Sequence, residues 1–404
     1  MISNLRTLLA PKKVTELLLT SRIVQKWPAG QTKRLFSQSV EVASNVTARQ
    51  QKTVGYWLLG CAGLVYGAVA IGGLDAVRYL PTTESGLSMV DWDLFRSMKP
   101  PMNEADWERE FEKYKSYPEY QYKDAYQDIT MTQFKFIWTM EYFHRMWGRG
   151  IGIAFFLPAA YFWYKGRFNG PMKARMGIAG SLILLQGLVG WWMVKSGLDP
   201  AKNSRSDVPR VSQYRLTTHL GLAFTLYALF LWNGLSHVMK PFDHSRSWLG
   251  LDPLEGLVHG VKAVIFLTAI MGGFVAGLEA GVIYNEWPKF AGRWVPSEIL
   301  EQKPFYRNFT ENPVTVQFLH RHLAYLTLFS VTLTWLKGRR LHLDRRARIA
   351  LHSLLIAGYS QAVLGISTLI YYSPVWLCAL HQNGGMALLT AAFWLSHEIR
   401  RLPK

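Results

Sequence analysis

Four histidines at matched positions are the residues of this sequence best suited to chemistry. His144 and His219 lie in the first half of the chain and His320 and His381 in the second, each near the start of a long apolar stretch. Neutral imidazole is a good ligand for haem iron, and two imidazoles on facing helices can hold one porphyrin between them. Ionisable side chains inside a membrane are costly and most often functional. The pattern therefore predicts two bis-histidine metal sites, each with a haem as occupant.

The residue one helical turn after each of these histidines is small, which would leave room for a flat macrocycle. These residues are Gly148, Ala223, Ala324 and Gly385. A single such histidine is more often a hydrogen-bonded packing residue, but the matched set favours iron ligation. The other seven histidines are interpreted as packing or loop residues. His322, two residues after His320, would face roughly the opposite side of the helix.

One carboxylate distinguishes the two halves. Glu141 precedes His144 by three residues on the same helical face, whereas the second half has Gln317 at the matching position. The difference indicates that chemistry takes place in the first half and that the second half holds a structural or electron-transfer haem. The alternative is that Glu141 is a solvated acid at a helix start.

Three arginines lie near the same ends of these helices. Arginine pairs carboxylates through two parallel hydrogen bonds, so these side chains could bind haem propionates. Anchoring at the membrane interface explains them equally well. The three candidates are Arg145, Arg149 and Arg321.

The elements that position these residues read as membrane-spanning helices. The 404-residue chain is half hydrophobic, and a bilayer span needs about 20 residues. Uncharged stretches predict spans at 54–74, 176–194, 216–239 and 263–278, and 349–397 holds two spans separated at Ser373-Pro374. Segments 143–164 and 317–336 complete a set of eight. The predicted fold class is an all-α integral membrane protein.

The distribution of charged residues among the loops predicts the orientation of the chain in the membrane. The net charge of +18 arises from basic residues in alternate loops, as around 165–175 and 337–348, whereas the loop 75–142 is acidic. The positive-inside rule places both termini on the basic side, and this explains the charge without nucleic-acid binding. All four histidines then lie at one depth, near the opposite face. Cys61 and Cys378 are interpreted as packing residues.

The first 53 residues contain nine Lys and Arg but two acidic residues, which is typical of a mitochondrial transit peptide. A disordered basic tail is the alternative. With a transit peptide, the basic side is the matrix, the membrane is the mitochondrial inner membrane, and the histidines lie near the intermembrane space.

An internal repeat organises the chain. Glu-Tyr-Phe-His-Arg at 141–145 matches Gln-Phe-Leu-His-Arg at 317–321, and 72–75 matches 276–279. Gln186 and Gly190 likewise match Gln361 and Gly365. We therefore predict two tandem four-helix bundles, 54–240 and 261–404, joined by a matrix linker, 241–260. Parallel repeats are related by a pseudo-twofold axis along the membrane normal.

On these residues the sequence resembles the mitochondrial haem A synthases. The resemblance covers about residues 55–398 and is carried by four motifs: 141–149, Thr-Thr-His-Leu-Gly around His219, Asn312-Pro-Val with His320-Arg-His-Leu-Ala, and Leu-His-Gln-Asn around His381. It implies oxidation of a ring methyl of haem O to the formyl group of haem A, which cytochrome c oxidase needs. Two successive hydroxylations and loss of water would be the route.

The resemblance also implies a role for each site. His320 and His381 would hold a haem B cofactor, His144 and His219 would ligate the substrate haem O, and Glu141 would be the catalytic carboxylate. A ferredoxin would supply electrons, and haem O synthase or oxidase assembly factors would be partners, alongside membrane lipid. Some bacterial members carry a cysteine pair in an outer loop; this chain lacks that pair, so no thiol relay is expected. The sequence leaves the oligomeric state open, a homo-oligomer included.

Two other functions use the same residues. A b-type membrane cytochrome would also ligate haem with paired histidines, passing electrons from quinol to a carrier without making haem A. A transporter or assembly scaffold would use the histidines structurally and show no haem absorbance. The acidic loop 75–142, rich in Tyr and Trp, is either a lid or a partner surface.

Overall fold

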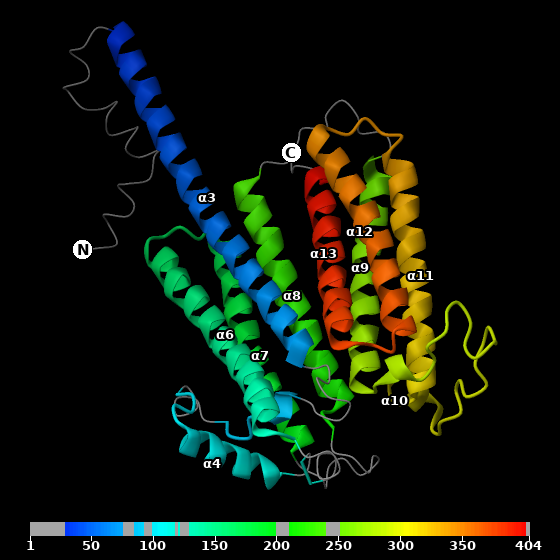
Figure 1. Cartoon of the computed structure of the whole chain (residues 1–404). Coiled ribbons are helices and arrows are strands. Elements are labelled where there is room, and N and C mark those ends of the chain that lie inside the picture. The colour runs from blue at the N-terminus through cyan, green and yellow to red at the C-terminus, as the bar shows by residue number, and fades with distance from the viewer. Residues whose placement is uncertain are drawn as a thin grey trace.

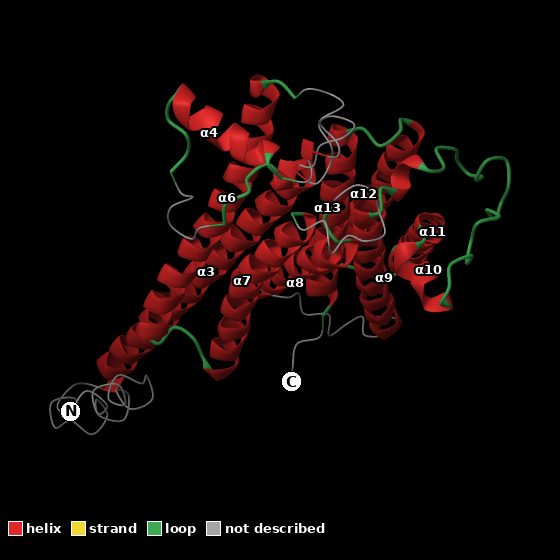
Figure 2. Ribbon diagram, turned by 90° about the horizontal axis from the view of Figure 1, so that it is seen from below, coloured by secondary structure: helices red, strands yellow, loops and turns green. Residues whose placement is uncertain are grey.

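A computed structural model of the protein describes residues 29–75, 85–92, 99–117, 120–121, 129–198, 210–239 and 251–400, with side chains from residue 49 onward. The described part is helical and contains no strand (Figures 1 and 2). Its eight long helices are α3 (Ala29–Asp75), α6 (Met131–Tyr164), α7 (Gly170–Gly197), α8 (Gln213–Val238), α9 (Leu251–Gly277), α11 (Pro313–Gly338), α12 (Arg345–Ile370) and α13 (Val375–Ile399). The short helices are η2 (Ser85–Leu87), α4 (Glu104–Lys115), η6 (Ala280–Val282), η7 (Phe305–Arg307) and α10 (Asn308–Glu311).

Each predicted span falls on one of the eight long helices, and the chain is an integral membrane protein. Among the described residues, four helical segments are long and apolar enough to cross a membrane: Arg49–Gly73, Gly170–Gly197, Leu251–Gly277 and Arg345–Ile370. The other four long helices carry the four histidines, and their polar and aromatic side chains lower their mean hydropathy. Helix α3 is longer than expected, because it extends back to Ala29 into the segment predicted as a transit peptide.

The long helices pack as two rings of four. In the first ring α3 contacts α6 and α8, and α7 contacts the same two helices; in the second ring α9 contacts α11 and α13, and α12 contacts the same two. The rings lie side by side (Figures 1 and 2), joined by contacts of α8 with α9 and of α13 with α3 and α8. Corresponding helices of the two halves therefore make corresponding contacts.

Local sequence sets where the helices begin. Thr130 and Gln133 form a capping box at the start of α6, and Asn312 caps α11 directly before Pro313. Asn169 and Asp344 accept backbone hydrogen bonds at the starts of α7 and α12. These caps fix the rotation and depth at which each helix presents its side chains.

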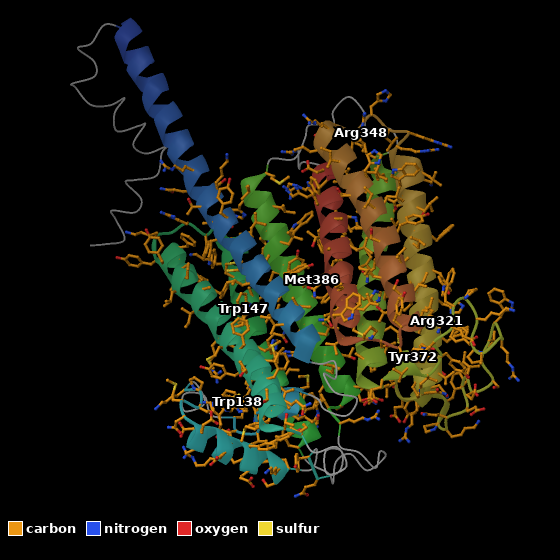
Figure 3. The ribbon with its side chains drawn as sticks, viewed as in Figure 1. Trp138, Trp147, Arg321, Arg348, Tyr372 and Met386 are labelled. Atoms are coloured by element: carbon orange, nitrogen blue, oxygen red, sulfur yellow. The ribbon has the colours of Figure 1, made fainter. Side chains whose placement is uncertain are left out.

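The two ends of the bundle are identified by the helix ends and residues that lie there. Helix α3 begins and α13 ends at the same end, where Arg348 lies, whereas Trp138 and Arg321 lie at the other end (Figures 1 and 3). We call the latter the outer end. Residues 1–28 of the predicted transit peptide, 241–250 of the predicted linker and the tail 401–404 lie outside the described residues.

Candidate paired-histidine sites

All four candidate histidines pack against a glycine of a neighbouring helix. A methyl group added to that glycine would lie 2.8 to 3.2 Å from Cε1 of the ring, so a larger residue would displace the imidazole. The contacts pair Gly72 with His144, Gly190 with His219, Gly272 with His320, and Gly365 with His381. The histidines are on α6, α8, α11 and α13 and the glycines on α3, α7, α9 and α12, so one arrangement occurs four times.

These contacts agree with the predicted match of Gly190 to Gly365 and correct another match. The sequence repeat aligned 72–75 with 276–279, but the glycine of α9 that contacts its histidine is Gly272, about one turn earlier. Gly277 packs instead against Gln213. The Gly-Gly pairs at 72–73 and 272–273 are the sequence signal that would have given the correct match.

The second-half pair has the separation that shared ligation requires. The ring centroids of His320 and His381 are 6.3 Å apart, with the ring planes at 84°. Two imidazoles bound to one metal through bonds of about 2 Å have centroids about 6 Å apart. Nδ1 of His320 lies 3.1 Å from the carbonyl of Thr268. Because a carbonyl only accepts, that nitrogen carries the proton and Nε2 remains for a metal.

A side-chain amide supports the other ring of this pair. Nε2 of Gln361 lies 3.1 Å from Nδ1 of His381 and donates to the His381 carbonyl at 2.8 Å. Gln361 and Gly365 are on α12, so one face of this helix sets both the orientation and the depth of the imidazole. These contacts fix how the imidazole is turned toward His320.

The first-half pair shares the glycine contacts of the second-half pair. His144 and His219 are both half-buried, and they lie close enough for a charge on one to act on the other. Nδ1 of His219 is buried without a hydrogen-bond partner among the described residues. The part of the chain that the structure describes has no cluster of three or more His, Cys, Asp or Glu side chains able to hold a bare metal ion. Two facing imidazoles with glycine beside each ring fit a haem, which supplies four ligands of its own.

Glu141 and Arg145 form a buried ion pair on α6 beside His144. Nε of Arg145 donates to Oε1 of Glu141 at 2.5 Å, and both side chains are at most 6% exposed. The guanidinium also donates to the carbonyls of Met89 and Asp91 and covers the ring of Trp92 at 4.2 Å. Arg145 therefore holds segment 85–92 against the outer end of α6.

Arg321 does the same in the second half. It donates to the carbonyls of Tyr284 and Lys289 and covers the ring of Phe290 at 4.1 Å. Its side-chain neighbour is Gln317, at a longer 3.4 Å. The sequence allowed these arginines to be either propionate partners or interface anchors; among the described residues, both donate to the backbone of an outer loop. Arg149, the third candidate, is half-buried, and its guanidinium lies 4.0 Å from the sulfur of Met146.

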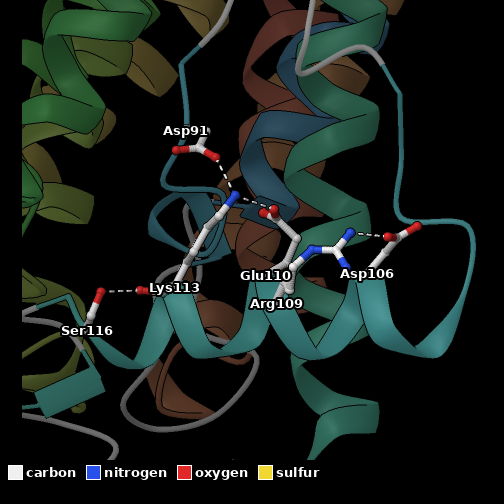
Figure 4. Close-up of polar contacts among 6 residues, drawn as sticks. All are labelled: Asp91, Asp106, Arg109, Glu110, Lys113 and Ser116. Atoms are coloured by element: carbon white, nitrogen blue, oxygen red, sulfur yellow. Dashed lines mark hydrogen bonds and ion pairs between the residues drawn. The ribbon is translucent and has the colours of Figure 1, made fainter.

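Helix α4 completes the outer end of the first half. Its Phe111 and Tyr114 pack with Phe134 and Trp138 of α6 in a small aromatic core. Lys113 donates to Asp91 at 2.8 Å and to Glu110 at 2.7 Å (Figure 4). These hydrogen bonds raise the pKa of the Lys113 ammonium above its usual range, the bond to Asp91 having the larger effect. Part of the acidic loop therefore covers the end of the bundle beside Glu141.

The remaining histidines mostly keep the roles predicted for them. His322 is exposed, and His352 accepts a hydrogen bond from Trp335 at an exposed position. His397, expected to be an ordinary helix-end residue, is instead fully buried, and neither of its ring nitrogens has a hydrogen-bond partner among the described residues. The sequence signal for this burial is that His397 ends a stretch, 349–397, without charged residues.

Comparison with known proteins identifies a family that covers most of the chain. Residues 55–393 match the model of the COX15-CtaA family, described as cytochrome oxidase assembly protein. This range contains all four histidines and Glu141.

Individual relatives extend the match over almost the whole chain. The human protein named heme A synthase COX15 is 48% identical over 88% of this chain and 84% of its own length. The yeast (Saccharomyces cerevisiae) protein of the same name is 40% identical over 98% of this chain and 86% of its own. A bacterial heme A synthase, from Nitrosospira multiformis, is 42% identical over 87% of this chain and 94% of its own.

Proposed function

The chain belongs to the COX15-CtaA family of cytochrome oxidase assembly proteins, and on that premise we propose that it is a haem A synthase. It is an oxidoreductase that converts a ring methyl of haem O to the formyl group of haem A. The observation that carries this proposal is the histidine–glycine contact, which is repeated four times within the family-matched range and gives each half the same pair of histidines. An electron-transfer cytochrome is not favoured, since the bacterial and eukaryotic relatives are named as synthases.

We assign the two sites different occupants. His144 and His219 ligate the substrate haem O, beside the Glu141 carboxylate; His320 and His381 hold a haem B cofactor. The 6.3 Å separation of the second pair supports its role as a ligand pair. A bound haem B supplies one-electron redox chemistry, which no side chain of this site offers.

Glu141 is the residue we assign to proton transfer. Arg145 holds Oε1, while Oε2 points toward Gly86 of the outer segment, 3.8 Å from the position of a Cβ there. Loss of water from a hydrated aldehyde needs a group that takes a proton from one hydroxyl and returns it to the hydroxyl that leaves. A fixed carboxylate three residues from His144 can do both, and segment 85–92 with α4 shields it from bulk water.

We place the enzyme in the mitochondrial inner membrane with eight spans, both termini in the matrix and the pseudo-twofold axis along the membrane normal. The matching helix contacts of the two rings support the axis, and the arginine-rich end that holds Arg348 supports the orientation. Electrons come from a ferredoxin on the matrix side, and Arg145, Arg149 and Arg321 are the candidates for propionate contacts.

The test is conversion of the substrate. Purified protein is incubated with haem O and a ferredoxin reducing system, with and without oxygen, and pigments are identified by mass. We expect haem A, and we expect Glu141→Ala to abolish it while the second-half haem is retained. Absence of haem A under every condition, with both haems bound, would refute the synthase assignment and favour the cytochrome.

A further inference from the structure

We propose that Gln317 sets the reduction potential of the second site, by leaving the buried charge of Arg321 without a counter-ion. The inference rests on the proposed function, since it requires a haem between His320 and His381. It concerns a polar position, 141 in the first half and 317 in the second, at which the two equivalent outer ends differ in charge.

In the first half the buried charge is neutralised. Arg145 and Glu141 are both buried, and the guanidinium Nε donates directly to the carboxylate. The pair is adjacent to His144 but contributes no net charge there.

In the second half the same arginine position is not neutralised. Arg321 is 7% exposed, and its Nε, the atom that binds Glu141 in the first half, is buried without a hydrogen-bond partner among the described residues. Gln317 directs its own Nε2 to the carbonyls of Ala280 and Tyr284. A neutral amide thus replaces the carboxylate, and the site keeps one full positive charge next to His320.

The acidic groups of the surrounding loop do not offset this charge. Glu298 accepts a hydrogen bond from Tyr284 and Glu286 accepts one from the amide of Gly292, and both carboxylates are exposed. The less exposed Glu279 and Glu311 each pair with another arginine, Arg210 and Arg307. Water screens exposed charges far more strongly than buried ones. Arg321 is therefore the dominant nearby charge.

A buried cation beside a haem disfavours the oxidised iron, which carries one more positive charge than the reduced iron. The second-half haem is consequently easier to reduce than it would be with glutamate at 317.

The experiment is a spectroelectrochemical titration of the full-length protein in detergent. A His144→Ala background isolates the second-half haem, and there we expect Gln317→Glu to lower the midpoint potential at unchanged haem content. Gln302→Glu, the same change at a half-buried position of the same loop, is the matched control and should shift it less. In a His320→Ala background, Glu141→Gln should raise the midpoint of the first-half haem.

The outcomes separate this inference from the proposed function. An unchanged midpoint in Gln317→Glu with haem retained overturns the inference but leaves the synthase standing. Failure of both backgrounds to bind any haem overturns the proposed function and the inference with it. If Gln317→Glu does not accumulate, the Glu141→Gln titration decides, and an absence of the upward shift refutes the electrostatic argument.

Discussion

His320 and His381 hold their ring centroids 6.3 Å apart with nearly perpendicular planes, and each ring also rests on a glycine of the neighbouring helix. The first relationship suits shared ligation of one iron, and the second keeps the rings in place. Both depend on helices that are far apart in the sequence.

Removal of either ligand of this pair should cost the same haem. Because both axial positions come from the protein, His320→Ala and His381→Ala should each lower the haem content by about half. His322→Ala is the control, as this exposed histidine is two residues away on the same helix. Pyridine haemochrome assay of the purified variants measures the loss; full haem content in either ligand variant would contradict the assignment.

The glycine contacts should be as necessary as the ligands. In Gly72→Ala the new methyl group would meet Cε1 of His144 at 2.9 Å, so we expect loss of haem from the first half and of haem A formation. Gly63→Ala changes the same helix where nothing lies within 4 Å and should behave as wild type. Absorbance per protein and product assay check this, and equal behaviour of the two variants would exclude a positioning role for Gly72.

Much of this arrangement could be predicted from hydropathy and spacing. Charge-free stretches located six of the eight long helices, segments 143–164 and 317–336 located the other two, and the matched motifs around His144 and His320 identified the repeat. Membrane-spanning helices are easily recognised because an uncharged apolar run of about 20 residues matches the thickness of the bilayer core. The four ligand candidates followed from the same repeat.

Contacts between remote elements could not be predicted. Arginine beside a haem-ligating histidine suggests a propionate partner, but Arg145 and Arg321 bind loop carbonyls that lie 32 to 56 residues away in the sequence. Loop position depends on tertiary packing, which the pattern of one helix does not encode. The outer loop of the first half also has its own aromatic core around Tyr114, independent of the repeat.

Glu141 should be required for catalysis, separately from its structural contact with Arg145. Glu141→Gln keeps the shape and a hydrogen-bond acceptor but not the proton transfer, so haem A formation should fall by roughly 10²-fold or more. Glu141→Ala in addition leaves a buried arginine unpaired, which costs about 3–5 kcal/mol. Glu104→Gln, an exposed partner of Lys135, is the control for activity and melting temperature. Near-normal turnover in Glu141→Gln would remove it from the mechanism.

Amide hydrogen exchange in segment 85–92 should become slightly faster when the ammonium of Lys113 is removed. Lys113 ties α4 to Asp91, whereas Lys115 pairs with Glu112 on its own helix. Lys113 and Asp91 are 45% and 50% exposed, and such ion pairs contribute about 0–1 kcal/mol, so Lys113→Met should speed amide exchange across 85–92 less than about fivefold. Lys115→Met should leave the exchange rate of this segment unchanged.

Because the pKa of Lys113 is raised on folding, the ion pair with Asp91 is complete at neutral pH and is lost as the pH rises through the raised pKa. Hydrogen exchange of wild type and Lys113→Met over an alkaline pH series would measure this loss. Since the buried Arg145 contacts persist in both variants, a complete loss of protection in Lys113→Met would mean that α4, and not Arg145, holds this segment in place.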